Sequence, residues 1–183
     1  MLILILITTL LRVEAFCPPN VTGRIAENLK SKSESKYREL VYIEKLRFTL
    51  RMQESGFDYS AIGANGEIGA YQFMPVEWAK KAMKYLHREV PATIHYQDTI
   101  AFCDIQELVM KKGYTIDQIA AFWNSGNPNS RKKGINKAGV PFDVPAYINS
   151  FKKIYESIDR AWGNQNQYNL FLYMRTDILV KKS

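Results

Sequence analysis

Residues 54–75 read ESGFDYSAIGANGEIGAYQFMP, and this stretch separates two segments with helical patterns. The segment before it predicts a helix over 37–54, because apolar residues recur there at intervals of three and four. They are Leu40, Ile43, Leu46 and Leu50. Gly56 ends this helix, and 57–74 form a loop rich in glycine. Pro75 can begin the next helix, because a residue in the first turn needs no partner for its N–H.

The rest of the chain also favours helices. The predicted helices span 76–87, 98–112 and 116–124. Thr115 is the expected N-cap of the last of these, and a basic loop follows over 127–141. Another helix opens at Asp143 or Pro145, and 161–183 are a weak helix or tail. The apolar face of that helix is Tyr147, Phe151, Ile154, Tyr155 and Ile158. No alternating run indicates a strand of any length, so the fold class is mainly α in one domain.

Composition and charge narrow the class of protein. Apolar residues make up 46% and charged residues 23% of the 183, which is typical of a folded globular chain with a core. The formal net charge of +7 indicates attraction to polyanions such as nucleic acid, anionic lipid or an acidic cell-wall polymer. Charge alone does not choose among these, although no nucleic-acid-binding motif is recognisable and we do not expect a nucleic-acid partner.

The first fifteen residues, MLILILITTLLRVEA, predict an export signal. They combine an apolar run with a small-residue cleavage pattern at 13–15. The run is too short to span a bilayer, so we expect no stable membrane insertion. The mature chain would start near Phe16, continue as an irregular N-terminal arm over 16–36, and act in the periplasm or outside the cell. A buried N-terminal helix is the alternative.

Cysteine and histidine usage gives little sign of a metal. Cys17 and Cys103 permit one disulfide in an exported protein or are two unrelated thiols. His87 and His95 have no companion cluster of histidines or cysteines, so neither a metal site nor another cofactor is predicted.

Glu54 is the candidate general acid. It comes at the carboxyl end of an amphipathic helix, with Leu50 and Phe57 nearby in the sequence. The negative end of the helix dipole and an apolar surround both disfavour ionisation, which raises the pKa of a carboxyl group. A raised pKa suits a general acid at neutral pH. The alternative is a solvated carboxylate at a helix end.

The loop after Glu54 has the composition of a sugar-binding segment. Glycines at 63, 66 and 69 let the backbone approach a ligand closely. Tyr71, Gln72 and Phe73 alternate ring, amide and ring, so apolar faces can stack on a sugar while the amide bonds to its polar groups. An ordinary loop with two core aromatics is the alternative.

This stretch resembles the catalytic segment of lysozyme-like lytic transglycosylases of the soluble transglycosylase type, including those of secretion, conjugation and phage systems. The family pattern is a helix ending in Glu-Ser, followed by a Gly-x-x-Gly-x-x-Gln-x-Met-Pro loop. The matching residues are Glu54, Ser55, Gly66, Gly69, Gln72, Met74 and Pro75. AFWNSG at 121–126 is similar to the family's second motif, Ala-Tyr-Asn-x-Gly, and Tyr147 to its late-helix tyrosine. The three motifs span about 40–158.

The resemblance implies a lysozyme-like domain over 37–160 that acts on peptidoglycan glycan strands. Glu54 would protonate the oxygen of the β-1,4 bond between N-acetylmuramic acid and N-acetylglucosamine. As a carboxylate it would then take the proton of the muramoyl C6 hydroxyl, which closes a 1,6-anhydro ring. Ser55 would orient the site or cap the helix, and Tyr147 would support Glu54 or the acetamido group.

The other implied site residues would contact the sugar. Gln72 and Asn124 would bond its polar groups, Tyr71 and Phe73 would stack or pack, and Gly69 would let the loop come close. Two positions depart from the family: Gly63 stands where serine is usual, and Phe122 lacks the usual hydroxyl.

Two further functions stay open. A hydrolytic lysozyme would use the same Glu54 with water as the attacking group, and Asp58 ordering that water would favour it. A non-catalytic glycan-binding or assembly protein would keep the groove without turnover, and the departures at Gly63 and Phe122 are its support. A secretion, conjugation or phage assembly is the larger partner that the resemblance implies.

Overall fold

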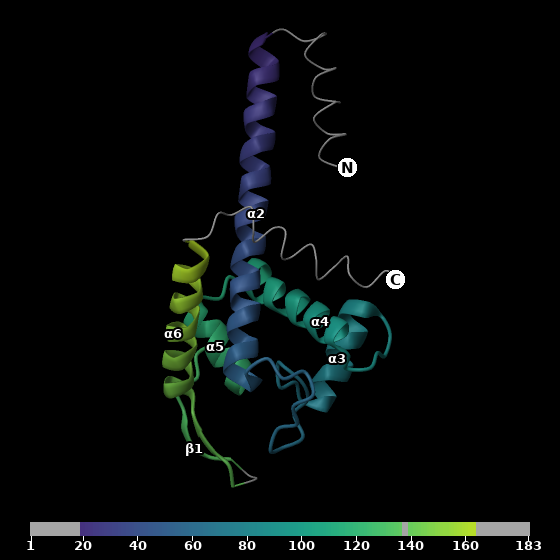
Figure 1. Ribbon diagram of the computed structural model, residues 1–183, viewed down its shortest axis with the longest axis vertical. Coiled ribbons are helices and arrows are strands. Elements are labelled where there is room, and N and C mark those ends of the chain that lie inside the picture. The colour runs from purple at the N-terminus through teal and green to yellow at the C-terminus, as the bar shows by residue number, and fades with distance from the viewer. Residues whose placement is uncertain (1–18, 137–138, 164–183) are drawn as a thin grey trace. The chain divides into compact units, whose positions relative to one another are not determined.

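The computed structural model describes residues 19–136 and 139–163, and it confirms a mainly helical fold (Figure 1). The elements in chain order are α2 (Pro19–Ser55), α3 (Pro75–Leu86), α4 (Ile94–Gln106), the π-helical turn η1 (Glu107–Lys111), α5 (Ile116–Ser125), β1 (Lys133–Ile135), β2 (Pro141–Asp143) and α6 (Val144–Gly163). Among the described residues, no helix combines the length and apolarity that crossing a membrane requires. The predicted export signal over 1–15 and most of the tail over 161–183 lie outside the described residues.

Helix α2 begins much earlier than the sequence suggested. The prediction of an irregular arm over 16–36 is wrong from Pro19 onward, because the chain is helical there. The stretch 31–36 is exposed and polar, but lysine and glutamate have good helix propensity and need no buried face. The boundary between two compact units falls within α2, between Tyr42 and Ile43. The candidate site belongs entirely to the second unit.

Helices α3 and α4 pack on each other and lie beyond the loop. Pro75 occupies the first turn of α3, as predicted. Helix α4 begins at Ile94 rather than 98, and Thr93 is its N-cap. The first turn of α4 was not predicted, because the buried residue there is the polar Gln97 and not an apolar one. Gly113 follows η1 with a φ of 63°, which explains why the helical run stops there.

Helices α5 and α6 form the other packed pair (Figure 1). Thr115 caps α5 as predicted: its hydroxyl accepts from the Gln118 N–H, while the Gln118 side chain accepts from the Thr115 N–H. Gly126 ends α5 in the left-handed conformation. Asp143 caps α6 by accepting a hydrogen bond of 2.8 Å from the Ala146 N–H.

A short antiparallel hairpin precedes α6 and corrects the prediction of an unbroken loop over 127–141. In the register of β1 and β2, Lys133 pairs with Asp143 and Gly134 with Phe142. Lys133 Nζ lies 2.8 Å from Asp143 Oδ2, which closes the open end of the hairpin. Strands of three residues are too short to show alternation in a sequence.

The core of the second unit draws on every helix of that unit. Its most buried apolar side chains include Ile43, Leu46, Leu50, Ile100, Ile105, Leu108, Ile119 and Phe151. Three of these are the residues whose spacing predicted the helix before the loop. Phe151 and Ile158 confirm the predicted apolar face of α6. The last turn of α2 is therefore held firmly against the domain that carries the candidate site.

Candidate active site

Glu54 lies on the last turn of α2, where the chain leaves the helix abruptly. Gly56 and Phe57 both have positive φ angles, 65° and 73°. The Phe57 ring packs edge-on against Phe48, with 4.6 Å between ring centroids, and the Arg51 guanidinium lies over it. This contact compensates for the unusual backbone of Phe57 and fixes the direction in which the loop departs.

The Glu54 side chain is largely buried and has one neutral partner. The Tyr147 hydroxyl on α6 donates a hydrogen bond to Glu54 Oε1. Burial raises the pKa of Glu54 to about 7; the Tyr147 hydrogen bond opposes this rise and the charge of Glu67 adds to it. Burial also raises the pKa of Tyr147 well above its ordinary value, so the phenol stays protonated and remains a donor.

The bond between Glu54 and Tyr147 is one of several side-chain links between α2 and α6, which also include the ion pair of Lys45 with Asp159. The Ser150 hydroxyl, three residues beyond Tyr147, donates to Gln53 Oε1 at 2.9 Å. Tyr147 contacts Oε1 of Glu54, so Oε2 is the oxygen left for other partners. With a pKa of about 7, the carboxyl group is protonated about half of the time at neutral pH.

Ser55 fastens the loop to the end of the helix. Its hydroxyl donates to the Ala70 carbonyl at 3.1 Å and accepts from the Asp58 N–H at 3.0 Å. One side chain thus joins the start of the loop to a point twelve residues further on. Of the roles predicted for Ser55, the structure shows this positioning of the loop.

Gly69 occupies a place that no other residue could fill. Its φ is 73°, and a Cβ there would overlap the side-chain amide of Gln97. Gln97 is buried and supports the loop with three hydrogen bonds: it accepts from the Ala70 N–H and donates to the carbonyls of Tyr59 and Ala92. Gln97 was not predicted as a site residue, since a glutamine within a helix is usually solvated.

Tyr71 and Phe73 lie in the core. They are 0% and 4% exposed, and their ring centroids are 5.8 Å apart. The Tyr71 hydroxyl donates to Asp98 at 2.7 Å, and Trp123 Nε1 donates to the Tyr71 carbonyl at 3.2 Å. Of the two roles predicted for these rings, stacking on a sugar and packing, the structure shows packing. Their burial fixes the backbone on either side of Gln72.

Gln72 lies between these two buried rings with a φ of 50°. Its Nε2 donates to the Gly69 carbonyl at 2.8 Å, so its Oε1 points the other way, toward Gly63 and Glu67. Glu67 reaches the site although sequence reasoning did not single it out. A single glutamate in a glycine-rich loop looks like a solvated charge, and only the folding of the loop brings it close enough to act on Glu54.

Two other predicted residues lie at the edge of this arrangement. Asn124 is exposed on the last turn of α5, and its neighbour Trp123 makes the contact with the loop. Asp58 is fully exposed, and its Oδ1 accepts from the N–H and hydroxyl of Ser60. Asp58 therefore closes a local turn, and the carboxylate whose charge acts on Glu54 is Glu67.

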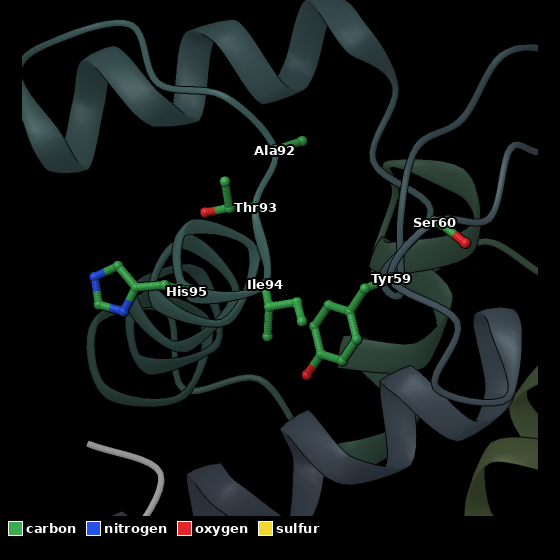
Figure 2. A pocket seen from close by; sticks show the side chains of 6 residues that line it. All are labelled: Tyr59, Ser60, Ala92, Thr93, Ile94 and His95. Atoms are coloured by element: carbon green, nitrogen blue, oxygen red, sulfur yellow. The ribbon is translucent and has the colours of Figure 1, made fainter. Parts of the chain in front are cut away.

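The site does not coincide with a pocket that the described residues form at the start of α4. That pocket has a volume of about 540 Å³ and is lined by Tyr59, Ser60, Ala92, Thr93, Ile94 and His95. Figure 2 shows the Tyr59 ring turned toward Ile94, with His95 pointing away from both. The lining contains neither Glu54 nor Tyr147, so the candidate acid lies outside this pocket. Within 19–136 and 139–163, no group of three or more histidines, cysteines and carboxylates is placed to hold a metal ion.

No family model matches the chain, and no curated protein or solved structure is significantly similar to it. The residues of the candidate site provide one acid with a pKa near neutrality, one neutral donor bound to it and one nearby carboxylate on a loop held by Ser55 and Gln97.

Proposed function

We propose that this protein is a peptidoglycan lytic transglycosylase with a lysozyme-like domain, and that Glu54 is its acid and then its base. The observation that carries the proposal is the state of Glu54: burial raises its pKa to about 7, and a neutral phenol holds it in place. A group with that pKa is half protonated near pH 7, so it can both give and take a proton in one turnover.

In the proposed reaction Glu54 protonates the glycosidic oxygen between N-acetylmuramic acid and N-acetylglucosamine, and the C1–O bond breaks. The 2-acetamido oxygen of the substrate stabilises the positive charge that develops at C1. The Glu54 carboxylate then accepts the proton of the C6 hydroxyl, whose oxygen bonds to C1. The product ends in a 1,6-anhydro ring, water is not consumed, and the proton returns to Glu54. Tyr147 holds the carboxyl group through both steps.

The hydrolytic lysozyme remains the second candidate. It needs a carboxylate that orders a water on the far side of the sugar. Asp58, the residue expected for this, is exposed and engaged by Ser60, which favours the transglycosylase. The non-catalytic binding protein is less favoured, because a glycan-binding groove has no need of a carboxyl group poised near neutral pH.

The setting of the reaction is part of the same proposal. A chain that cuts peptidoglycan would work in the cell envelope, and a positive charge would help it to approach the acidic peptides of the wall. Arg131 and Lys132 are exposed directly before β1 and would contribute to this attraction. Lys133 is paired with Asp143, and Lys137 lies outside the described residues. A secretion, conjugation or phage assembly is the expected larger partner.

The test is a digestion of purified peptidoglycan, with the released muropeptides weighed by mass spectrometry. We expect products lighter by one water than hydrolysed sugars, and a loss of about a thousandfold or more in their release with Glu54→Gln. Asp58→Asn is the matched control, four residues away, and should keep nearly full activity. Reducing-end products would identify a lysozyme instead. Binding to walls without any release would leave the non-catalytic protein.

A further inference from the structure

The pocket at the start of α4 is a second concave site, separate from Glu54. Two segments build it: the loop at Tyr59 and Ser60, and the stretch 92–95 that leads into α4. Its volume of about 540 Å³ falls within the range of roughly 300–1,000 Å³ that is common for small-molecule sites. In Figure 2 the Tyr59 ring is turned toward Ile94, so an aromatic and an aliphatic side chain form two of its walls.

The Tyr59 wall of the pocket is fixed before any ligand arrives. The Tyr59 hydroxyl accepts from Arg51 Nη1 at 2.6 Å and donates to Asp98 Oδ1 at 2.8 Å. Its backbone carbonyl also accepts from Gln97 Nε2 at 3.0 Å. Because the ring is held at both ends, it cannot easily turn inward to fill the pocket, and this preorganisation reduces the cost of binding a ligand.

The lining indicates a neutral ligand with one apolar ring. The six lining residues include no carboxylate, lysine or arginine, and the His95 ring points away from Tyr59 and Ile94 (Figure 2). Thr93 is exposed, and its hydroxyl makes no capping bond to α4, so it can bond to one polar group of a ligand. A flat ring can pack between Tyr59 and Ile94, whereas a sugar carries more hydroxyl groups than this lining can bond.

The buried side chain of Gln97 joins the pocket to the loop of the candidate site. Gln97 Nε2 donates to the carbonyls of Tyr59 and Ala92, which belong to the two different segments of the pocket. Gln97 Oε1 accepts from the Ala70 N–H at 2.8 Å, and the Ala70 carbonyl accepts from Ser55 at the end of α2. The walls of the pocket and the loop are therefore held by the same amide group.

Asp98 provides a second link between the same two places. Its Oδ1 accepts from the hydroxyl of Tyr59 in the pocket wall and from that of Tyr71 in the loop, at 2.8 and 2.7 Å. Tyr71 follows Ala70 directly, so both links reach one point of the loop. A molecule that contacts Tyr59 and Ile94 together favours the state in which these hydrogen bonds are all made.

We propose that this pocket is an effector site for a small neutral molecule with an aromatic ring and one N–H or O–H group. Its occupation stabilises the loop of the candidate site through Gln97 and Asp98. This role would hold whichever reaction Glu54 performs, because the links run through the loop and not through the substrate.

Indole is the probe, because it has one flat ring system and one N–H. It is titrated into the full chain, and NMR shifts of the Thr93 and Ile94 amides report binding. Hydrogen exchange of the Ala70 amide reports the effect on the loop, and the Gly126 amide at the end of α5 is the reference. We expect a dissociation constant on the order of 1 mM. At ten times that concentration, exchange at Ala70 should slow about tenfold, while exchange at Gly126 should not change.

Two exposed apolar residues provide the test variant and its control. Ile94→Asp places a charge on the pocket wall, and the protein should fold, because Ile94 is 49% exposed and an acidic residue suits the first turn of a helix. We expect it to lose indole binding and the slower exchange at Ala70. Met110→Asp changes a residue that is 53% exposed on η1, beyond the other end of α4, and should bind indole as the wild type does.

Several outcomes would overturn the effector role. They are a wild type in which indole shifts neither Thr93 nor Ile94, equal binding by Ile94→Asp, and binding without any change at Ala70. Equal slowing at Ala70 and Gly126 would show general stabilisation of the domain instead of a link to the loop. Shifts of the same pocket amides with the N-acetylglucosamine trimer would make the pocket part of a glycan-binding cleft, which would also overturn the effector role.

Discussion

Helix α2 carries two carboxyl groups ten residues apart, Glu44 buried and Glu54 largely buried, and their partners differ in charge. Glu44 is 7% exposed and lies 2.7 Å from the Arg47 guanidinium. Glu54 is bound by the neutral Tyr147. Burial raises the pKa of both groups, but at Glu44 the charge of Arg47 opposes the rise. The same residue type on the same helix is thus part of an ion pair in one place and a poised acid in the other.

The region around Glu44 is a network in which charges balance one another. Asp98 accepts from the hydroxyls of Tyr59 and Tyr71 and lies 3.6 Å from Arg51 and 3.8 Å from Arg47. It joins α2, the loop and α4 from inside the domain. The region around Glu54 has no such balance, since the nearby charge of Glu67 is negative. A charged partner makes a buried carboxylate structural, and a neutral one leaves it free to exchange protons.

The largest effect on stability is expected in the balanced network. Asp98→Asn removes the carboxylate that lies between two arginines, and we expect a loss of about 3 kcal/mol in the free energy of unfolding. The measurement is urea unfolding at pH 7. Asp159→Asn is the control, because that carboxylate pairs with Lys45 but is 57% exposed, and such a pair contributes about 0.5 kcal/mol. Equal losses of unfolding free energy in the two variants would show that the network stabilises the fold no more than an exposed ion pair does.

Replacing each glutamate of α2 by glutamine should change the stability at pH 8 in opposite directions. The folded pKa of Glu54 is about 7 against an ordinary value of 4.5, so its contribution to stability is greatest below pH 4.5 and is lost as pH rises to 7. We therefore expect Glu54→Gln to gain about 2 kcal/mol at pH 8 relative to wild type, and about nothing at pH 4. Glu44→Gln should lose stability at pH 8, because it leaves Arg47 without its nearest partner. Urea unfolding at both pH values measures this, and a loss in both variants at pH 8 would contradict the comparison.

The smallest effect is a shift in the pH dependence of activity. Tyr147→Phe removes the hydrogen bond that lowers the pKa of Glu54, so that pKa should rise. The acid form then persists to higher pH, and the alkaline limb of the activity profile should move upward. Muropeptide release measured between pH 5 and pH 9 tests the shift. Ser150→Ala breaks the neighbouring hydrogen bond between α6 and Gln53 of α2 and should leave the limb where it is. A limb that moves equally in both variants would point to a general loosening of the helix pair.

Much of the fold follows from local patterns in the sequence. Leu46 and Leu50 marked the buried face of α2, Thr115 the start of α5 and Pro75 the start of α3, because each depends on residues a few positions away. The helix before residue 37 and the hairpin of β1 and β2 were not predicted from the sequence. A solvated helix has no apolar stripe, and strands of three residues have no measurable alternation.

The features of the site likewise separate into those set by neighbouring residues and those set by tertiary contacts. The sequence alone determined that Glu54 ends an amphipathic helix and that a glycine-rich loop follows, since both are properties of consecutive residues. It indicated Tyr147 as one of several candidate supports but could not show that its hydroxyl reaches Glu54, 93 positions away. Only the tertiary structure buried Tyr71 and Phe73, gave Gly69 its buried neighbour Gln97, and brought Glu67 beside Glu54. Burial and the charge of a neighbour set the pKa of a carboxyl group, and both arise only when distant segments fold against one another.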